Sequence, residues 1–329
     1  MTWRRALIAV AVIIVLIGAF GAVQFVREKN AFDHIEIAAP GHDGVRVHQA
    51  GVFANYFPSD RSGRQPGIVL LGGSEGGISR YTNDAARALQ DEGFSVLAPS
   101  YFGGPDEPKH LVLVPLETFD RAIDWLRRQP AVDPQRIAIA GVSKGAEAAL
   151  LVATRHPELR AVFAGVPSSV VWPGIQFGKL KTPSSWTLGG KPLPFLPYGP
   201  FRFSEVLGDV GAVYRDGLKH ASIHADVQIP IEKIKAPVLL ECGEADKLWP
   251  SCVMARQLKA RAEQHGGPSV QLLAYPDAGH LSVGPPVARS DPLYRGLARF
   301  GGTIEGNNRA RVEGWPKIVA FARRALGSL

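Results

Sequence analysis

The sequence predicts an α/β protein built around a mostly parallel sheet with helices on both faces. Short apolar runs of strand length alternate with longer segments whose apolar residues recur at helical spacing. This alternation is typical of parallel sheets, because parallel neighbours need a crossover between them, usually a helix. The runs assigned to strands lie near Ile68, Phe94, Ile137, Ala161, Val238 and Val270. The segments assigned to helices are residues 79–92, 116–129, 144–156, 251–265 and 311–326.

The amino-terminal residues predict a membrane anchor. Residues 6–26 contain no charged side chain and are long enough to cross a bilayer as a helix. Because Arg4 and Arg5 precede this segment, we expect a single-pass anchor over residues 1–29 with its amino terminus in the cytoplasm. The rest of the chain would then lie in the periplasm or otherwise outside the cytoplasm. A cleaved signal peptide is the alternative that the same residues allow.

Residues 30–329 fit one elaborated domain, since α/β folds commonly reach that size without splitting. Within it, residues 35–56 alternate in character around Asp43 and Gly44. This pattern predicts antiparallel strands and a hairpin ahead of the main sheet.

A glycine-rich loop, residues 72–77, follows the apolar strand that we assign to residues 67–71. Backbone N–H groups in such a loop can stabilise a negatively charged oxygen, and we choose Ser74 as the donor. A plain turn or a phosphate-binding loop is the alternative. No Lys-Ser or Lys-Thr pair follows the glycines, so a Walker-type nucleotide site is disfavoured.

Ser143 is the candidate nucleophile. It stands between an apolar strand, residues 137–142, and a helix that begins at Lys144. With Gly141 and Gly145 it completes a G-x-S-x-G pattern on a strand-to-helix turn, which projects a serine hydroxyl from the end of a sheet. The backbone N–H of Lys144 is the second expected donor to an oxyanion.

A serine nucleophile needs a general base and an acid that orients the base. The apolar run at residues 237–241 ends shortly before Asp246, and the run at residues 270–275 ends shortly before His280. Loops at the carboxyl ends of strands collect the catalytic groups of an open α/β sheet. We therefore assign Asp246 as the acid and His280 as the base.

Two further acids remain open as alternatives to Asp246. Glu244 is a rival because loop geometry cannot be read from sequence to within two residues. Asp277 lies close before His280 on one turn, which makes it the weaker rival.

Residues 167–230 interrupt the alternation with a long stretch rich in proline, glycine and aromatic residues. A connection of this length inside a compact domain is usually functional, and we interpret it as a lid over Ser143. Its aromatic side chains would line an apolar substrate pocket, although such rings also pack a lid on the body of a domain. The residues concerned are Trp172, Phe177, Trp186, Phe195 and Tyr198.

Other candidate sites are weaker. His220, His224 and Asp226 have a spacing that zinc could use, but a third strong ligand is missing, so we expect no metal and no cofactor. Cys242 and Cys252 are the only cysteines, and both free buried thiols and a disulfide stay open. The net charge of +7 is spread over predicted helices, which indicates a solvated surface with affinity for anionic lipid and not a nucleic-acid interface.

The order and spacing of several segments are similar to those of a known family. The segments are GIVLLGGSEGG, GFSVLAPSYFG, PLETFDRAIDWL, IAGVSKGAEAAL, IPIEKIKAPVLLECGEADKLWPS and YPDAGH. They resemble the carboxy-terminal catalytic domain of acyl-CoA thioester hydrolases and bile acid-CoA:amino acid N-acyltransferases, a dienelactone-hydrolase-like α/β-hydrolase. The resemblance covers roughly residues 67–325. It implies an α/β-hydrolase fold with Ser143 as nucleophile, Asp246 as acid and His280 as base.

The resemblance implies hydrolysis of a small-molecule ester or acyl thioester through an acyl-enzyme on Ser143. The family's acyltransferases use cysteine as nucleophile, so the serine favours hydrolysis. N-acyl transfer and a non-catalytic anchored binding module remain the alternatives. The family's amino-terminal β-sandwich domain has no counterpart in the short stretch before Gly67, from which we expect small or medium acyl esters to be preferred over long-chain acyl-CoA.

Overall fold

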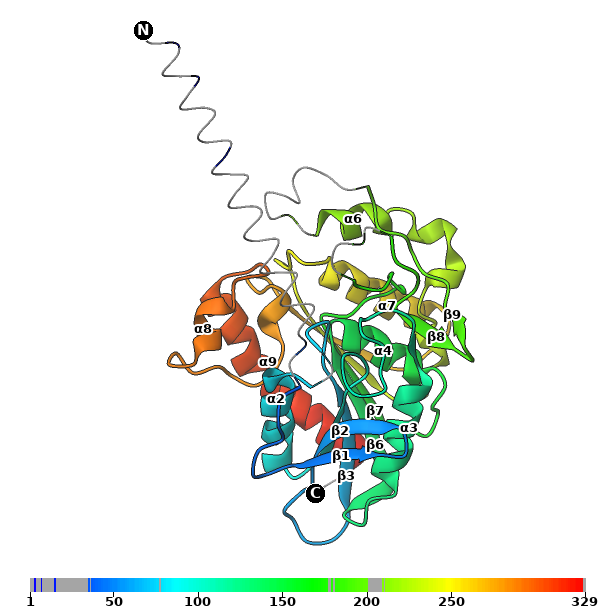
Figure 1. Ribbon diagram of the computed structural model, residues 1–329, viewed down its shortest axis with the longest axis vertical. Coiled ribbons are helices and arrows are strands. Elements are labelled where there is room, and N and C mark those ends of the chain that lie inside the picture. The colour runs from blue at the N-terminus through cyan, green and yellow to red at the C-terminus, as the bar shows by residue number, and fades with distance from the viewer. Residues whose placement is uncertain are drawn as a thin grey trace.

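Within the described residues, an eight-stranded sheet forms the centre of the protein, in the order β1-β2-β4-β3-β6-β7-β10-β11 (Figure 1). The computed structural model describes residues 37–76, 78–176, 181–200 and 211–327, together with Trp3, Leu7, Val15, Ile35, Lys179 and Asp209. The strands of this sheet are β1 (Val45–Gln49), β2 (Val52–Phe57), β3 (Gln65–Leu71), β4 (Ser95–Pro99), β6 (Val132–Val142), β7 (Ala161–Gly165), β10 (Val238–Gly243) and β11 (Val270–Tyr275).

The strands from β4 to β11 in this order pair in parallel. Strand β2 pairs antiparallel with both of its neighbours, β1 and β4. Strand β3 is buried along its whole length, as a parallel strand covered on both faces should be. The predicted, mostly parallel α/β architecture is therefore confirmed.

The predicted hairpin has its turn at a different place. Strands β1 and β2 are joined by Ala50 and Gly51, which both have positive φ angles, of 52° and 70°. Two-residue hairpin turns favour this backbone conformation because it matches the twist of the flanking strands. Asp43 and Gly44 instead precede β1, so the prediction that they form the hairpin turn is wrong.

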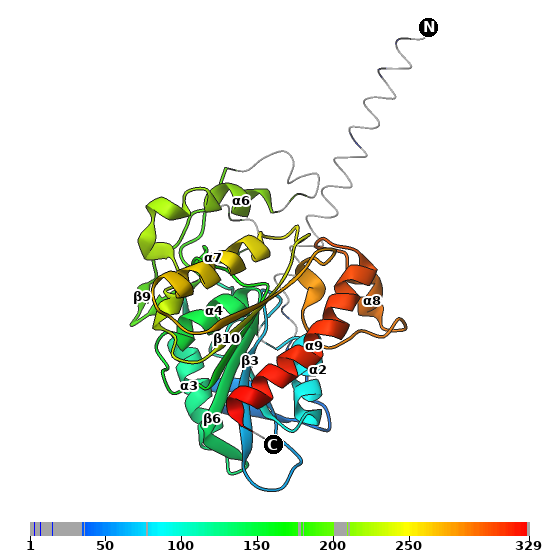
Figure 2. The same cartoon turned by 180° about the vertical axis from the view of Figure 1, so that it is seen from behind.

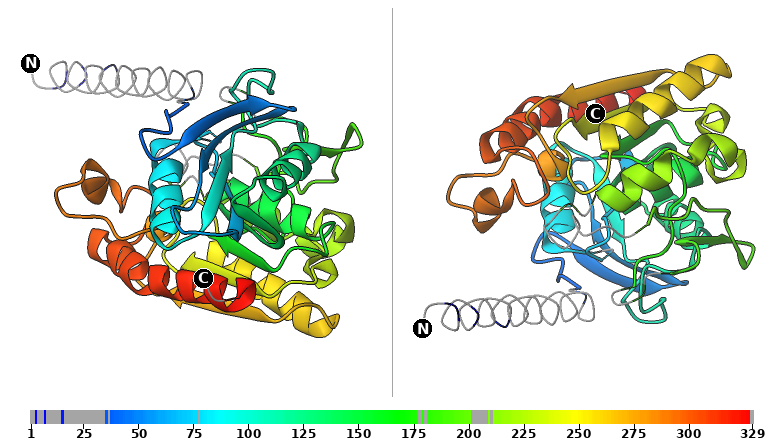
Figure 3. Two further views of the ribbon diagram at one scale, coloured as in Figure 1. Left: turned by 90° about the horizontal axis from the view of Figure 1, so that it is seen from below. Right: turned by 90° about the horizontal axis from the view of Figure 1, so that it is seen from above.

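Helices cover both faces of the sheet. Apolar residues of α3, α4 and α7 pack in one core cluster, and those of α2 and α9 pack in a second on the other face (Figure 3). The helices are α2 (Arg80–Asp91), α3 (Glu117–Arg127), α4 (Lys144–Ala153), α6 (Ala212–Leu218), α7 (Ser251–Gln264), α8 (Pro292–Gly296) and α9 (Ile304–Leu326). The last helix begins earlier than its apolar spacing predicted, because the Thr303 side chain accepts a hydrogen bond from the Gly306 N–H and caps it there.

The predicted membrane anchor, residues 6–26, lies outside the described residues except for Leu7 and Val15. In the part of the chain that the structure describes, no helix combines the length and the apolar character needed to cross a membrane. The prediction of a single-pass anchor with an extracytoplasmic catalytic domain is wrong on this finding.

A long connection between β7 and β10 contains the segment that we expected to be a lid. It includes α6, three single turns of 3-10 helix and two short strands, and it lies on the same side of the molecule as α7 (Figure 2). The turns are η1 (Ala221–Ile223), η2 (Ala225–Val227) and η3 (Ile231–Lys233). Strand β8 (Trp186–Leu188) pairs with β5 (Val114–Pro115) on one side and with β9 (Lys191–Pro192) on the other.

A buried carboxylate on α4 fastens this connection to the body of the protein. Lys144 Nζ donates to Glu147 Oε2 at 2.7 Å, and both side chains are almost completely buried. Glu147 Oε1 accepts the Trp172 backbone N–H at 3.1 Å and the Trp186 indole N–H at 2.8 Å. Burial raises the pKa of Glu147 and lowers the pKa of Lys144, while their mutual attraction opposes both shifts. The three donors offset the cost of burying this carboxylate.

Cys242 and Cys252 form a disulfide between the end of β10 and the first turn of α7. Of the two alternatives that the sequence left open, the structure therefore has the bridge. It closes the loop that carries Asp246, with a sequence separation of 10 between the two cysteines.

We expect Glu147→Ala to lower the free energy of unfolding by about 3–5 kcal/mol, because it leaves the Lys144 ammonium buried without its partner. The matched control is the double variant Lys144→Met/Glu147→Met, which removes both charges and should recover part of this loss. Urea denaturation followed by circular dichroism measures all three proteins. A single variant as stable as the wild type would show that the ion pair does not hold this region.

Reduction of the Cys242–Cys252 bridge should lower the free energy of unfolding by about 3 kcal/mol, because it returns chain entropy to the unfolded state. Thermal unfolding with and without dithiothreitol measures the effect. The double variant Cys242→Ser/Cys252→Ser is the control and should not respond to the reducing agent. Equal melting temperatures for the oxidised and reduced wild type would contradict this expectation.

Candidate active site

Ser143 lies on a sharp turn between β6 and α4. Its backbone has φ 57° and ψ −121°, a conformation that residues other than glycine rarely adopt. The chain can pack this closely because of two glycines. A Cβ atom on Gly141 would collide with the Gly145 carbonyl, and one on Gly145 would collide with the Gly72 carbonyl. The G-x-S-x-G glycines are thus required by the close approach of backbone to backbone.

The structure brings Ser143, His280 and Asp246 into one hydrogen-bonded chain. Ser143 Oγ lies 2.9 Å from His280 Nε2, and His280 Nδ1 lies 2.9 Å from Asp246 Oδ2. Ser143 and His280 are only 8% and 5% exposed. The Asp246 carboxylate also accepts the Leu248 N–H at 2.9 Å and the Ser251 hydroxyl at 2.7 Å. These donors fix the carboxylate, which in turn orients the imidazole.

The two rival acids are engaged elsewhere. Glu244 forms an ion pair with Arg256, and Asp277 forms one with Arg309 at 2.7 Å. Both pairs are substantially exposed. Of the three acids that the sequence offered, only Asp246 has a carboxylate at hydrogen-bond distance from His280 in the described structure.

Aromatic residues hold the imidazole from two sides. The rings of Trp249 and Phe300 lie edge-on to His280, with centroid distances of 5.7 and 6.4 Å. The backbone N–H of His280 donates to the Phe300 carbonyl at 3.3 Å. The Trp249 indole N–H donates to the Val166 carbonyl at 3.1 Å. The side chains that position His280 therefore come from the segments after β10 and β11, and a backbone carbonyl after β7 in turn holds Trp249.

The glycine loop after β3 reaches the same place. A Cβ atom on Gly73 would lie 3.3 Å from Ser143 Cβ, so the Gly73 backbone stands against the turn. The Gly73 N–H donates to Glu75 Oε1 at 3.0 Å. Desolvation of the Glu75 carboxyl raises its pKa, although hydrogen bonds and the nearby His280 oppose the shift. The sequence analysis chose Ser74 from this loop as an oxyanion donor, which stays a prediction; the contact with Ser143 Cβ makes Gly73 a second candidate, which a run of glycines alone does not single out.

The N–H of Lys144 is the first of helix α4. The first N–H groups of a helix have no acceptor within the helix and carry partial positive charge. Gly73 and Lys144 thus place two backbone donors beside Ser143, one from the loop that contacts it and one from the residue that follows it.

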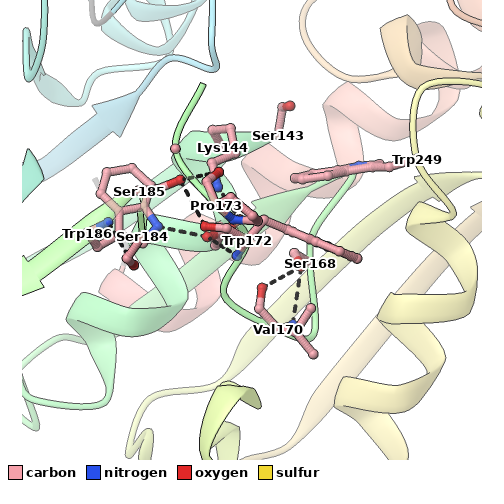
Figure 4. Close-up of polar contacts among 12 residues, drawn as sticks. Ser143, Lys144, Ser168, Val170, Trp172, Pro173, Ser184, Ser185, Trp186 and Trp249 are labelled. Carbon is pink, nitrogen blue, oxygen red and sulfur yellow. Dashed lines mark hydrogen bonds and ion pairs between the residues drawn. The ribbon is translucent and has the colours of Figure 1, made fainter. Parts of the chain in front are cut away.

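The aromatic residues expected in the substrate pocket pack tightly. Trp172 and Trp186 are fully buried, Phe195 is partly buried against the main core, and Phe177 lies outside the described residues. Figure 4 shows how the chain around the two tryptophans is fastened. The Ser185 hydroxyl lies 3.1 and 2.9 Å from the carbonyls of Trp172 and Pro173, and the Trp186 N–H donates to Ser184 Oγ at 3.2 Å. These contacts match the alternative to pocket lining, in which the rings pack the long connection on the body of the domain.

The histidines considered for zinc lie in the long connection. His220 and His224 flank η1, and Asp226 is in η2. No group of three or more metal-binding side chains is found among the residues that the structure describes.

Comparison with known proteins places the chain in a family. Residues 114–328 match the family model described as BAAT / Acyl-CoA thioester hydrolase C terminal. Acyl-coenzyme A thioesterase 1 of Mus musculus is 29% identical over 307 residues, which cover 92% of this chain and 70% of that protein. Acyl-coenzyme A amino acid N-acyltransferase 2 of Mus musculus is 28% identical over 298 residues, which cover 87% of this chain and 66% of that protein.

A solved structure shows the same fold. The putative dienelactone hydrolase from Klebsiella pneumoniae subsp. pneumoniae MGH 78578 superposes with a TM-score of 0.53 at 16% identity, covering 85% of this chain and 97% of that one. The predicted α/β-hydrolase fold and the predicted enzyme class, a serine hydrolase of the thioesterase and carboxylesterase type, are confirmed. Because the family model matches well over half of its length, this chain belongs to the BAAT and acyl-CoA thioester hydrolase carboxy-terminal family.

Proposed function

We propose that the protein hydrolyses an acyl thioester or ester through an acyl-enzyme on Ser143. The observation that carries this proposal is the hydrogen-bonded chain from Ser143 through His280 to Asp246. Such a chain supplies what a serine hydroxyl lacks, namely a base that accepts its proton and a carboxylate that stabilises the resulting imidazolium.

In the first half of the reaction, His280 Nε2 takes the proton from Ser143 Oγ while Oγ attacks the acyl carbonyl. The carbonyl oxygen becomes negatively charged, and the backbone N–H groups of Lys144 and Gly73 donate to it. Ser74, named from the sequence for the same loop, stays a prediction. His280 then gives its proton to the leaving sulfur or oxygen, and the acyl group remains on Ser143.

In the second half, water attacks the acyl-enzyme and His280 accepts one of its protons. Collapse of the second tetrahedral intermediate returns that proton to Ser143 Oγ and releases the free acid. Asp246 accepts the His280 Nδ1–H throughout and so keeps Nε2 free to take the proton from Ser143. Every bond broken at Ser143 is thus restored at the end of the cycle.

The proposed substrate class is an acyl thioester, with acyl esters as the second group. It is supported by the family match and by relatives whose names are those of acyl-coenzyme A thioesterases. A relative named as an N-acyltransferase keeps acyl transfer to an amine as the competing reaction. Serine at position 143 favours hydrolysis, since water readily turns over oxygen-linked acyl-enzymes.

We further propose that residues 30–329 form one hydrolase domain in which residues 167–230 act as a lid. The hydrogen bonds from Trp172 and Trp186 to Glu147 support this, because they attach the segment to α4 within one turn of Ser143. Pocket lining by Trp172, Trp186 and Phe195 stays a prediction.

We expect Ser143→Ala to abolish covalent labelling by a fluorophosphonate probe and to lower kcat by about four to six orders of magnitude. The reason is that no other group at this turn can form the acyl-enzyme. Ser222→Ala, which changes an exposed serine in η1, is the matched control and should leave labelling and kcat unchanged. Labelling that survives the Ser143 change would exclude Ser143 as the nucleophile.

When an acyl-CoA is supplied together with glycine or taurine, we expect free acid to exceed the amide product. Mass spectrometry of the products measures the ratio. Hydrolysis predicts that the ratio stays high as the amine concentration rises to millimolar levels. An amide majority would show that the protein is an acyltransferase.

A further inference from the structure

A buried tyrosine hydroxyl lies beneath the glycine loop that contacts Ser143. Tyr101, which follows β4, is completely buried, and its hydroxyl lies 2.7 Å from both the Gly72 and the Gly73 carbonyl oxygens. Carbonyl oxygens only accept hydrogen bonds, so the phenol must be the donor. Burial raises the pKa of Tyr101 well above its ordinary value, and nearby carboxylates raise it further. The hydroxyl therefore keeps the proton that these carbonyls require.

Because the peptide bond is planar, the contact between Tyr101 and the Gly72 carbonyl also fixes the orientation of the Gly73 N–H. In a trans peptide the carbonyl and the following N–H point to opposite sides, and the described residues contain no cis peptide. The Gly72 carbonyl and the Gly73 N–H belong to one peptide group. Because Tyr101 holds the carbonyl, the Gly73 N–H must point away from Tyr101.

On the side to which the Gly73 N–H points, the structure places a carboxyl oxygen that accepts it. Glu75 Oε1 accepts this N–H at 3.0 Å, and the Gly73 backbone lies against Ser143 Cβ. Glu75 Oε1 thus accepts the hydrogen bond that the Gly73 N–H would donate to the oxyanion of a substrate bound to Ser143. The Glu75 residue as a whole is exposed although its carboxyl is desolvated, so a substrate would displace the carboxyl from this donor toward solvent.

Tyr101 is itself held by packed rings. Phe102 and Phe119 lie edge-on to it at centroid distances of 5.2 and 5.3 Å, and Trp186 lies at 5.9 Å. The Trp186 indole donates to Glu147 on helix α4, whose first residue supplies the other proposed donor. The loop that contains Gly73 and the start of α4 are thus braced by one continuous buried network.

We infer that Tyr101 is a positioning residue for the oxyanion site, where its hydroxyl fixes the Gly72–Gly73 peptide so that the Gly73 N–H is directed at the oxyanion on Ser143. This inference rests on the proposed function. A tyrosine that merely stabilises the fold would change the amount of folded enzyme. A positioning tyrosine changes the rate of each folded molecule, since the donor acts only when the oxyanion forms.

The test is Tyr101→Phe, which keeps the ring and removes the donor. We expect kcat per active site to fall by about 10- to 100-fold, with KM changed by less than about threefold. This loss in kcat is somewhat smaller than the loss caused by removing an oxyanion donor altogether. Active sites are counted by fluorophosphonate titration carried to completion, so unfolded protein does not contribute. Affinity for a boronic acid, which forms an anionic tetrahedral adduct on serine, should fall by a similar factor.

Tyr275→Phe is the matched control. The Tyr275 hydroxyl on β11 is buried and has no hydrogen-bond partner within the described part of the chain, so its removal should leave kcat per active site unchanged. If Tyr101→Phe fails to fold, Tyr101→Met removes the same donor and should show the same loss per active site.

The rate of fluorophosphonate labelling distinguishes failure of the proposed function from failure of the role of Tyr101, because labelling needs Ser143 but no particular acyl substrate. Wild-type protein that is not labelled would overturn the proposed function. Wild type and Tyr101→Phe labelled at equal rates, or a loss that appears in KM alone, would overturn the role of Tyr101 and leave the proposed function in place.

Discussion

The close contact of three backbone segments at Ser143 is the constraint on which the rest of the site depends. The segment through Gly141 touches the start of α4 at Gly145, and Gly145 in turn touches the carbonyl of Gly72 in the loop after β3. Only glycine leaves enough room at these two positions. The positive φ of Ser143 is held in place because its N–H donates to the Gly165 carbonyl at 2.9 Å and its own carbonyl begins the hydrogen bonding of α4. Local strain is thus maintained by the surrounding sheet.

Around this contact the protein has two buried carboxylates, those of Glu147 and Asp246, whose oxygens all have hydrogen-bond partners. Glu147 binds three donors, and Asp246 accepts hydrogen bonds from two backbone N–H groups and a hydroxyl besides His280. Glu241 is the informative contrast, because neither of its buried oxygens has a hydrogen-bond partner in the described structure, and desolvation raises its pKa to about 8. The paired carboxylates lie beside the elbow and the unpaired one lies against α9, where Gly314 makes room for it. The polar network is therefore concentrated where side-chain geometry has to be held.

The sequence predicted the site residues that follow directly from a strand and missed those that depend on packing between distant segments. Ser143, Asp246 and His280 each come shortly after an apolar run, so the topology of a parallel sheet brings them to one edge. The prediction placed the hairpin turn at Asp43 and Gly44 because Asp and Gly are common turn residues. The chain instead turns at Ala50, although alanine seldom adopts a positive φ. The contacts of Tyr101 and of the Gly73 N–H became evident only in three dimensions, and the structure was also needed to decide between free thiols and a bridge at Cys242 and Cys252. No periodicity or spacing encodes a hydroxyl beneath a loop nearly thirty residues earlier in the chain.

The central claim is that the reaction passes through an acyl group on Ser143, and rapid-quench mass spectrometry tests it most directly. The protein is mixed with an acyl thioester, quenched in acid within milliseconds and digested. The account predicts an acyl adduct on the peptide that contains Ser143, formed and consumed at rates at least as fast as kcat. Steady turnover without such an adduct under conditions where deacylation limits the rate, or an adduct on another residue, would contradict it.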